Sequence, residues 1–300
     1  MKVSLIIPCY NEEGNVRPLY DTVVRTFDGV VPDYEFVFID DGSRDRTPEV
    51  LNELVATADK PVKAVHFSRN YGKESAILAG LNEASGDCFT IMDGDLQQGP
   101  DVVVEMVRYL EEHTDCDCVT AFQENRHESP VMVFFKNGFY GLINRISDVE
   151  FVNGASDFRT FRRSVRDSIL DLAEYHRFSK GIFAWVGFET KFIPYTACER
   201  VHGKTKWNFF KLLNYAIEGI IGYSTAPLRL ATVLGTMTGI SAVLYLIWVV
   251  CEKLFMGIDI PGYATIIVLI LLLGSIQLFC IGIIGEYVGR TFEQSKDRPI

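Results

Sequence analysis

The sequence predicts an α/β domain built on a mostly parallel sheet, followed by two membrane-spanning helices. Strand-like and helix-like segments alternate through the first half of the chain, which is the pattern of parallel strands joined by helices. Two long stretches without a charge follow, Ala231 to Val250 and Tyr263 to Ile284. A helix of about twenty residues rises about 30 Å, the thickness of bilayer hydrocarbon. Two buried core helices are the alternative, but core helices are rarely apolar on every side.

Strands are expected at short apolar runs, and helices where apolar residues recur every three or four positions. The expected strands are Val3–Pro8, Tyr34–Ile39, Val62–Phe67, Cys88–Met92 and Cys118–Phe122. The helices expected between them are about Asn15–Phe27, a segment from Thr47, Lys73–Ala84 and Asp101–Glu112. Pro100 precedes the last of these, and proline is favoured in the first turn of a helix. Residues 130–225 are less regular, with helices expected at Phe134–Ile146 and Trp207–Tyr223.

The segment Trp207–Tyr223 has a broad apolar face and only two charged residues, Lys211 and Glu218. Because it stands directly before the first apolar stretch, we expect it to lie in the membrane interface. Ordinary packing in the core of the α/β domain is the alternative.

Basic residues flank the pair of apolar stretches on their outer sides. Arg200, Lys204, Lys206, Lys211 and Arg229 precede the first stretch, and Arg290, Lys296 and Arg298 follow the second. The segment between them carries only Glu252, Lys253 and Asp259. Positive flanks lie on the cytoplasmic side of a membrane. We therefore expect a multi-pass protein of the plasma (inner) membrane with both termini in the cytoplasm.

Composition excludes several classes of protein. A net charge of −10 argues against nucleic acid as a partner. The seven cysteines are scattered and the five histidines show no zinc-binding spacing, as expected for reduced thiols in a cytosolic domain. The apolar run after Lys2 is too short for a signal peptide. Neither GxGxxG nor GxxxxGK[ST] occurs, which disfavours a nicotinamide dehydrogenase and a P-loop NTPase.

Polar residues follow four expected strands, at the edge where open α/β sheets bind ligands. These segments are Cys9-Tyr10-Asn11-Glu12, Asp40-Asp41-Gly42-Ser43, Ser68-Arg69-Asn70-Tyr71-Gly72-Lys73 and Asp93-Gly94-Asp95-Leu96-Gln97. The side chain of Tyr10 can stack on a base, and Asp41 can accept from a base N–H or a ribose hydroxyl. Two carboxylates one residue apart suit Mg²⁺ or Mn²⁺, which binds one or two carboxylates together with substrate phosphates. Taken alone, Asp93 and Asp95 also fit a solvated turn.

These motifs resemble those of family 2 glycosyltransferases of the GT-A fold. The narrower resemblance is to the polyprenyl-phosphate glycosyltransferases, the group of dolichol-phosphate mannose synthase and bactoprenol glucosyltransferase. It covers essentially the whole chain and also includes Asp157-Phe158-Arg159, Arg177-Phe178, Trp185-Val186-Gly187-Phe188, Arg200 through Lys206, and Gly285-Glu286-Tyr287-Val288-Gly289-Arg290.

The resemblance implies a role for individual residues. The residues that match the family's nucleoside pocket are Pro8, Tyr10, Glu12, Ile39 and Asp41. Its diphosphate–metal turn is matched by Asp93, Gly94 and Asp95, and the implied ligands of Mg²⁺ or Mn²⁺ are Asp93, Asp95 and Gln97. Basic residues for the phosphates of donor or acceptor are Arg126, Arg200 and Lys206. The residues assigned to catalysis are Asp95, Asp157, Arg200 and Lys206.

The chain departs from the family pattern at three places. Gln98-Gly99-Pro100 stands where an acidic or other polar residue is often followed by two prolines. Ala121-Phe122-Gln123 lacks an arginine that is often present, which puts one phosphate contact in doubt. Lys204-Thr205-Lys206-Trp207 replaces a common Glu-Ser-Lys-Tyr and adds a positive charge.

The implied reaction is the inverting transfer of a hexose, with UDP-glucose as the first candidate donor, to polyprenyl (undecaprenyl) phosphate for cell-envelope glycosylation. The acceptor phosphate carries its own negative charge and needs no general base. Arg200, Lys204 and Lys206 stand where a lipid phosphate arrives, although attraction to the membrane surface explains them too. For Asp157 three roles stay open: binding or positioning of the sugar, a structural pair with Arg159, and a base.

The expected organisation is a cytoplasmic GT-A domain (1–206), an interface helix (207–226), a hairpin (227–290, with spans at about 231–251 and 263–285) and a cytoplasmic tail (291–300). The spacing of Gly235 and Gly239, and of Gly285 and Gly289, allows close helix contact within the hairpin or in a homo-oligomer. The alternatives are a catalytically silent membrane scaffold that binds a nucleotide sugar, and a processive polysaccharide synthase. The second needs more spans and a Gln-x-x-Arg-Trp motif, which the sequence lacks.

Overall fold

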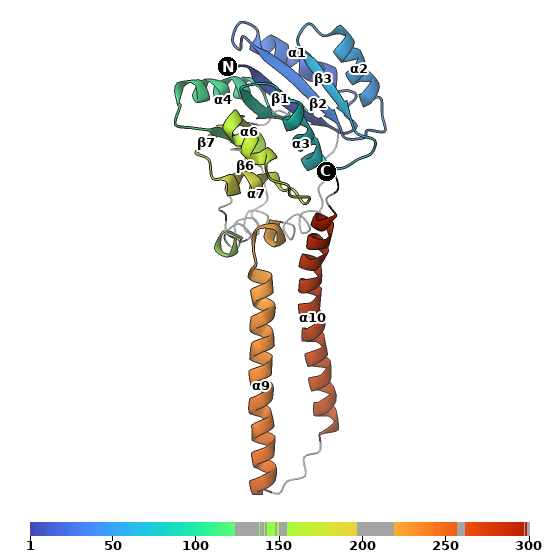
Figure 1. Cartoon of the computed structure of the whole chain (residues 1–300), viewed down its shortest axis with the longest axis vertical. Coiled ribbons are helices and arrows are strands. Elements are labelled where there is room, and N and C mark those ends of the chain that lie inside the picture. The colour runs from blue at the N-terminus through green and yellow to red at the C-terminus, as the bar shows by residue number, and fades with distance from the viewer. Residues whose placement is uncertain are drawn as a thin grey trace. The chain divides into compact units, whose positions relative to one another are not determined.

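The computed structural model describes residues 1–123, 138, 141, 143–147, 149, 155–196, 219–256, 262–296 and 298. By its internal contacts the chain divides into two compact units. The first consists mainly of Met1–Asn144 and Val149–Asn214, and the second of Arg145–Asp148 and Tyr215–Pro299. The first unit contains an α/β domain and the second contains two long helices (Figure 1).

A single mixed sheet of seven strands forms the centre of the α/β domain in the described residues. Its strands, in spatial order, are β3 (Val62–His66), β2 (Tyr34–Asp40), β1 (Val3–Cys9), β4 (Cys88–Ile91), β6 (Ala155–Arg162), β5 (Cys118–Gln123) and β7 (Thr190–Tyr195). All neighbours pair in parallel except β6, which runs antiparallel to both β4 and β5. The predicted α/β fold with a mostly parallel sheet is therefore confirmed.

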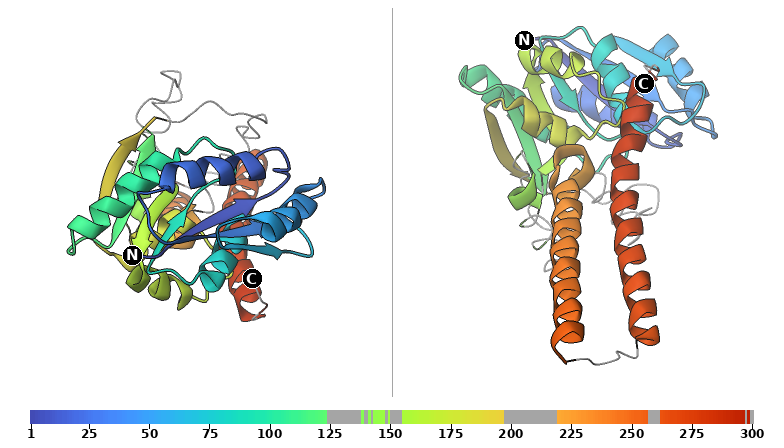
Figure 2. Two further views of the ribbon diagram at one scale, coloured as in Figure 1. Left: turned by 90° about the horizontal axis from the view of Figure 1, so that it is seen from above. Right: turned by 60° about the horizontal axis from the view of Figure 1, so that its bottom comes forward.

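Helices cover both faces of this sheet (Figure 2). One group consists of α1 (Val16–Phe27), α2 (Thr47–Thr57) and α4 (Pro100–Glu112), and the other of α3 (Lys73–Glu83), α6 (Arg163–Leu170) and α7 (Ser179–Val186). Alternate residues of β1 serve the two faces, because side chains of a strand point to opposite sides in turn. Leu5 and Ile7 join the core beneath α1, whereas Ile6 faces α3 at Gly80. A Cβ atom at Gly80 would overlap the Ile6 side chain, so glycine permits this close packing.

Among the described residues of the α/β domain, four elements were not predicted from the sequence: β6, α6, α7 and β7. Strand β6 was missed because its inward positions include polar residues that only the tertiary structure satisfies. Thr160 is fully buried and its hydroxyl shares a 2.8 Å hydrogen bond with Thr90 on β4. Arg159 is also buried, with its guanidinium 4.0 Å from the centre of the Phe183 ring. Most of the predicted helices Phe134–Ile146 and Trp207–Tyr223 lies outside the described residues.

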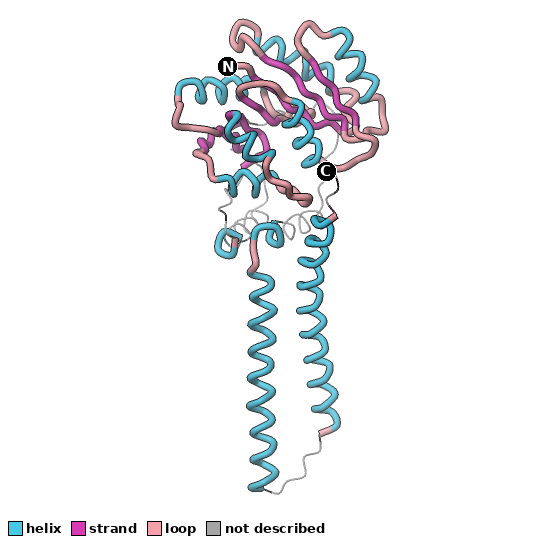
Figure 3. The backbone as a smooth tube through the Cα atoms, in the orientation of Figure 1, coloured by secondary structure: helices cyan, strands magenta, loops and turns pink. Residues whose placement is uncertain are grey.

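The second unit contains two long apolar helices, α9 (Ala226–Met256) and α10 (Tyr263–Ser295), which pack against each other (Figure 3). The candidate spans are Ala226–Glu252 and Val268–Ser295, and an 18-residue window within each has a mean hydropathy of 2.0 and 2.5, respectively. Both are long and apolar enough to cross a membrane. The helices extend beyond the predicted spans, and α10 continues into the expected tail, because helical hydrogen bonding persists after the apolar stretch ends. The Tyr287 hydroxyl donates to the carbonyl oxygen of Ser224 at 2.6 Å.

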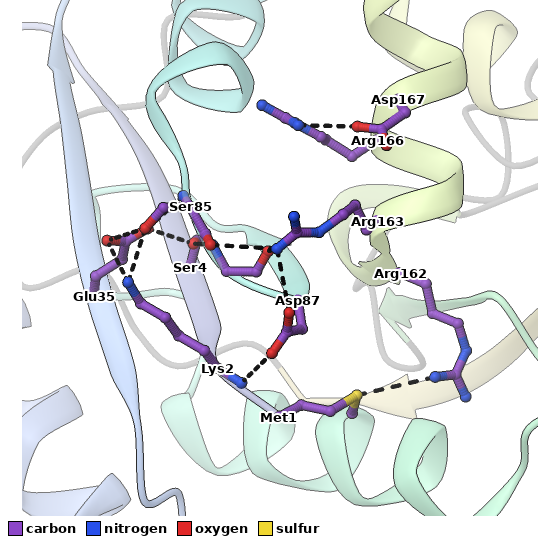
Figure 4. A network of polar contacts seen from close by, with 11 residues as sticks. Met1, Lys2, Ser4, Glu35, Ser85, Asp87, Arg162, Arg163, Arg166 and Asp167 are labelled. Atoms are coloured by element: carbon purple, nitrogen blue, oxygen red, sulfur yellow. Dashed lines mark hydrogen bonds and ion pairs between the residues drawn. The ribbon is translucent and has the colours of Figure 1, made fainter.

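The buried carboxylate of Glu35 lies at the amino ends of the strands (Figure 4). The four polar segments of the predicted site follow the opposite, carboxyl ends. Glu35 on β2 accepts from the Ser4 hydroxyl at 2.7 Å, the Ser85 backbone N–H at 2.6 Å and the Lys2 ammonium at 3.1 Å. Burial is the largest influence and raises its pKa, but these hydrogen bonds outweigh burial and bring the pKa of Glu35 to about 2. The network fastens β1, β2 and the start of β4 together.

Candidate active site

The loops that follow β1 and β2 are joined by hydrogen bonds between side chains and backbone. The Asn11 N–H donates to the Ser43 hydroxyl at 2.9 Å, and the Arg44 N–H donates to the Asn11 side-chain oxygen at 2.8 Å. The Glu12 N–H donates to the Thr47 hydroxyl at 2.8 Å. Asn11 has a φ of 56°, in the left-handed region that asparagine tolerates better than most residues. These bonds fix the backbone on either side of Asn11, and so the positions of Tyr10 and Glu12.

The remaining residues of the predicted nucleoside pocket lie beside these loops. Pro8 and Ile39 are direct partners in the parallel register of β1 and β2. Asp41 is buried, and its carboxylate accepts from the backbone N–H groups of Tyr71 at 2.7 Å and Gly72 at 3.0 Å. Burial raises the pKa of Asp41, although these hydrogen bonds oppose the shift. Asp41 thus anchors the loop between β3 and α3, a task that the sequence did not reveal.

The loops after β2 and β3 touch each other at Gly42. Its φ is +63°, and a Cβ atom there would collide with the backbone of Arg69. Glycine is needed both for the conformation and for the close approach. In the adjoining loop the Arg69 guanidinium lies 4.6 Å from the centre of the exposed Tyr71 ring.

The Asp93-Gly94-Asp95 turn lies against the end of β1. A Cβ atom at Gly94 would be 3.6 Å from the Pro8 carbonyl oxygen and 3.8 Å from the Glu12 Cγ atom. The predicted metal turn and the predicted nucleoside pocket are therefore adjacent. This matches the expectation, drawn from the strand order, that these motifs converge at one edge of the sheet.

The Asp93-Gly94-Asp95 turn, the predicted metal turn, is followed by a residue with a strained backbone. Leu96 has a φ of 61°, which is rare for a bulky residue and is tolerated where the surroundings fix the conformation. Its side chain packs against the hydrophobic core. The preceding carboxylate, that of Asp95, accepts from the Gln97 N–H at 3.2 Å. Asp95 and Gln97, two predicted metal ligands, thus belong to one constrained turn.

Gln98 is a site residue that was not identified from the sequence. It is buried, and its side-chain oxygen accepts from the Asp93 N–H at 2.7 Å while its NH₂ group donates to Asp93 Oδ2 at 3.0 Å. An ionised acid at this position could accept but could not donate to Asp93. The departure from the family pattern at Gln98 was the sequence signal that could have identified this residue, because an amide can both accept a hydrogen bond from Asp93 and donate one to it.

Lys73, at the first position of α3, connects two carboxylates of the site. Its ammonium lies 2.6 Å from Asp93 Oδ1 and 3.1 Å from Asp157 Oδ2. Asp157 is on β6, so this ion pair links the metal turn to the antiparallel strand beside β4. Burial, the largest influence, lowers the pKa of Lys73, but the two carboxylates outweigh it and the net shift is upward.

Asp157 is ionised at neutral pH. Burial is the largest influence and raises its pKa, yet the positive charges of Lys73, Lys180 and Arg159 outweigh burial and bring the pKa to about 2. The ion pair of Asp157 is formed with Lys73, whereas Arg159 donates to the Ser156 carbonyl oxygen at 2.8 Å. A carboxylate with so low a pKa is a weak base, which leaves positioning as the chemistry that the geometry favours.

The next residue of α3 fastens a further element to the site. Glu74 accepts from the Ser179 N–H at 3.1 Å and from the Ser179 hydroxyl. Ser179 is the first residue of α7. Burial is the largest cause of the raised pKa of Glu74. The first turn of α3 therefore contacts the metal turn, β6 and α7.

The donor set of the turn fits a divalent cation. Two carboxylates and one amide are hard oxygen donors, as Mg²⁺ and Mn²⁺ require, and phosphate oxygens and water complete such a shell. Within the part of the chain that the structure describes, no three histidine, cysteine or acidic side chains gather as a metal site. Arg126, Arg200, Lys204 and Lys206 lie outside the described residues.

Sequence comparison identifies the class of protein that this fold and site define. The profile of "Glycosyl transferase family 2" matches residues 4–170, and that of "GtrB C-terminal hairpin" matches residues 226–291. The first match covers more than half of the chain, and the chain belongs to glycosyltransferase family 2. The predicted resemblance and the assignment as a glycosyltransferase are confirmed.

Individual relatives match over the whole chain. "Bactoprenol glucosyl transferase" of Shigella phage SfV is 40% identical over 301 aligned positions, which cover 100% of this chain and 97% of the relative. "Putative glycosyltransferase CsbB" of Bacillus subtilis (strain 168) is 39% identical, with 99% and 89% covered. Among solved structures, mannosyl-3-phosphoglycerate synthase from Rubrobacter xylanophilus aligns with a TM-score of 0.51 at 15% identity, covering 73% of this chain and 71% of that one. That last likeness shows a shared fold.

Proposed function

We propose that this glycosyltransferase transfers a hexose from a nucleotide diphosphate sugar to polyprenyl phosphate at the cytoplasmic face of the membrane. UDP-glucose and undecaprenyl phosphate are the first candidates for donor and acceptor, and cell-envelope glycosylation is the expected use of the product. The observation that carries the proposal is that the Asp93-Gly94-Asp95 turn lies against the loop after β1, which is hydrogen-bonded to the loop after β2. The same chain has two helices long and apolar enough to cross a membrane. Whole-length similarity to relatives named bactoprenol glucosyl transferase supports this choice of acceptor and sugar.

The donor is proposed to bind across the ends of β1, β2 and β4. Tyr10 stacks on the base beside Pro8, while Ile39, the register partner of Pro8, is fully buried against Gly80 and supports the pocket from within the core. Asp41 shapes the pocket through the loop that it anchors. Mg²⁺ or Mn²⁺, when bound by Asp93, Asp95 and Gln97, neutralises the charge that develops on the leaving nucleotide diphosphate.

The acceptor phosphate is proposed to attack the anomeric carbon from the face opposite the leaving group, which inverts the configuration. A phosphate monoester is already ionised at neutral pH and needs no base. The ionised Asp157 fits this chemistry, because it can accept from a sugar hydroxyl without taking a proton from the acceptor. Arg126, Arg200 and Lys206 are proposed, from the family resemblance, to offset the repulsion between the phosphates of donor and acceptor.

The hairpin is proposed to cross the plasma membrane twice and to leave both termini in the cytoplasm. This orientation follows from the basic residues outside the two spans. A fluorescent protein fused to the C-terminus should fold and emit, since it would remain in the cytoplasm. Activity of a periplasmic phosphatase fused at the same point would contradict the orientation.

A homo-oligomer is proposed from the small residues of the hairpin. For Gly235, Gly239, Gly285 and Gly289, a Cβ built on the glycine would have no described atom within 4 Å apart from its chain neighbours and the nearby backbone of its own helix. These positions are thus not used for close contact between α9 and α10, and remain available for contact with a second copy. Native mass spectrometry from mild detergent should show more than one copy, and a monomer mass alone would contradict this.

The deciding experiment for the function uses purified full-length protein in detergent with Mn²⁺ or Mg²⁺, undecaprenyl phosphate and a panel of nucleotide sugars. Mass spectrometry should detect one hexose added to the lipid phosphate. Asp95→Ala should abolish the product while membrane insertion and the circular dichroism spectrum are retained. Asp21→Ala is the matched control, because Asp21 is an exposed carboxylate of α1 that pairs with Arg17 at 3.2 Å.

The outcomes separate the proposal from its alternatives. A single hexose that depends on Asp95 and on the metal supports the proposed reaction and names the sugar. Nucleotide binding without a product from any donor would favour a silent scaffold or another acceptor. A ladder of products with several sugars would favour a processive synthase. The anomeric configuration of the product, determined by NMR against that of the donor, tests inversion.

A further inference from the structure

Lys73 is a positively charged residue in contact with the Asp93-Gly94-Asp95 turn. Its ammonium is 2.6 Å from Asp93 Oδ1, while the second oxygen of that carboxylate accepts from the Gln98 amide at 3.0 Å. Both oxygens of Asp93 are therefore engaged by the protein itself. A divalent cation that binds Asp93 must share or replace the contact with Lys73, because two cations on one carboxylate repel each other.

Lys73 also contacts a second carboxylate, that of Asp157, which lies on another strand of the sheet. The same ammonium lies 3.1 Å from Asp157 Oδ2 on β6, a strand that reaches the site from a distant part of the sequence. An ammonium displaced from Asp93 has Asp157 as a partner already in place. Occupation of Asp93 by a metal thus leaves Asp157 as the carboxylate that pairs with Lys73.

We propose that Lys73 is a positioning residue that acts as a placeholder cation: in the donor-free enzyme it holds Asp93 and Asp157 together and weakens binding of a divalent metal until the donor diphosphate supplies further ligands. The inference rests on the proposed metal-dependent function. It deepens that function by assigning an order, in which metal and donor bind together and metal alone binds weakly. On binding, the Lys73 ammonium transfers from Asp93 to Asp157.

The charges around Lys73 determine the direction of the effect. Asp93 and Asp157 both contact the Lys73 ammonium. Burial is the largest cause of the raised pKa of the neighbouring Glu74, and the negative charge of Asp157 adds to it. The positive charges of Lys180 and Arg159 also act on Asp157 and remain when Lys73 is removed. Loss of the Lys73 charge therefore leaves a more negative pocket, which attracts a divalent cation more strongly.

The size of the effect is limited by exposure. An opposite charge within 4–6 Å changes proton binding to a carboxylate by about tenfold to a thousandfold, and solvent screening reduces such effects. The Lys73 side chain is 40% exposed and that of Asp93 is 36% exposed. We therefore expect the low end of this range, a change in metal affinity of about tenfold.

The test measures binding of Mn²⁺ to the full chain in detergent by electron paramagnetic resonance of free Mn²⁺, without and with UDP. Lys73→Met should bind Mn²⁺ without UDP about tenfold more tightly than the wild type. Lys73→Arg keeps the charge and should stay within about twofold of the wild type. With UDP present, the advantage of Lys73→Met should shrink, because the diphosphate then lacks a nearby positive charge.

Two controls separate charge competition from a structural defect. Lys63→Met removes a lysine that donates to the Glu83 carbonyl oxygen, away from the site, and should leave Mn²⁺ binding unchanged. If Lys73→Met fails to fold, Lys73→Gln is measured by thermal unfolding, where Mn²⁺ should raise the Tm more than in the wild type. A purely structural lysine would lower the Tm without tightening Mn²⁺ binding.

The results distinguish this inference from the function on which it rests. Equal or weaker Mn²⁺ binding in Lys73→Met, with a wild type that binds Mn²⁺ in the presence of UDP, overturns the placeholder role and leaves the proposed function intact. Absence of Mn²⁺ binding in the wild type with UDP, together with transfer in excess chelator, overturns the metal assignment and this inference with it.

Discussion

Replacement of Glu35 by glutamine tests whether the buried carboxylate at the amino ends of the strands stabilises the fold. Glu35 accepts hydrogen bonds from Ser4, Ser85 and Lys2 (Figure 4). Glu35→Gln keeps the shape of the side chain but removes its negative charge. It also places an NH₂ group where two protein donors now point, so at least one of these bonds is lost.

The magnitude follows from the pKa. Folding lowers the pKa of Glu35 from its ordinary value of 4.5 to about 2. Each pKa unit corresponds to about 1.4 kcal/mol, so the ionised carboxylate contributes about 3 kcal/mol to the free energy of unfolding. For a domain of this size, a loss of that order lowers the Tm by about 6–12 °C.

The pH dependence has a definite sign. A carboxylate whose pKa is lowered by folding stabilises the protein fully above its unfolded pKa, and this contribution is lost as the pH falls through the folded value. For Glu35 the window runs from 4.5 down to about 2. The difference in Tm between wild type and Glu35→Gln should therefore be largest near neutral pH and should shrink on acidification through this window.

Thermal unfolding of the full chain in detergent, followed by circular dichroism, is the assay. Glu111→Gln serves as the matched control, because Glu111 is an exposed acid that pairs with the amino terminus at 3.3 Å. Such surface pairs contribute about 0–1 kcal/mol. A Tm for Glu35→Gln within about 2 °C of the wild type at neutral pH, or a difference that does not shrink in acid, would refute the reasoning.

Three further substitutions probe the site. Gly42→Ala should destabilise the domain by about 2 kcal/mol or more and raise the KM for the donor, because alanine resists the left-handed conformation and its Cβ collides with the Arg69 backbone. Thermal unfolding measures the loss of stability, and initial rates measure the KM. Gln98→Ala removes one hydrogen bond to the Asp93 carboxylate, worth about 1.5–3 kcal/mol, and one from the Asp93 backbone N–H, worth about 0.5–1.5 kcal/mol, and should lower kcat/KM by at least tenfold. Unchanged kinetics would show that Asp93 needs no such support. The pKa of Asp157, about 2, lies below the range of any practical assay, so the pH–rate profile should show no Asp157 titration, and an acidic limb lost in Asp157→Asn would contradict this.

The sequence by itself determined the parts of this protein whose signals are local. Apolar runs marked β1, β2 and β4, and the polar residues that follow them marked the edge of the sheet where the site lies. Two uncharged stretches marked α9 and α10, because a helix long enough to cross a bilayer needs a continuous apolar sequence. Strand order and the family motifs together placed the Asp93-Gly94-Asp95 turn beside the nucleoside loops.

Only the tertiary structure decided which distant groups meet at that edge. Lys73 and Asp157 are 84 positions apart, and Glu74 and Ser179 are 105 apart, so neither pairing leaves a periodic trace in the sequence. Strand β6 was missed for the same reason, because its buried Thr160 and Arg159 contact Thr90 of β4 and Phe183 of α7. Local pattern reports how a segment folds, whereas a contact between charged groups depends on where the whole sheet brings them.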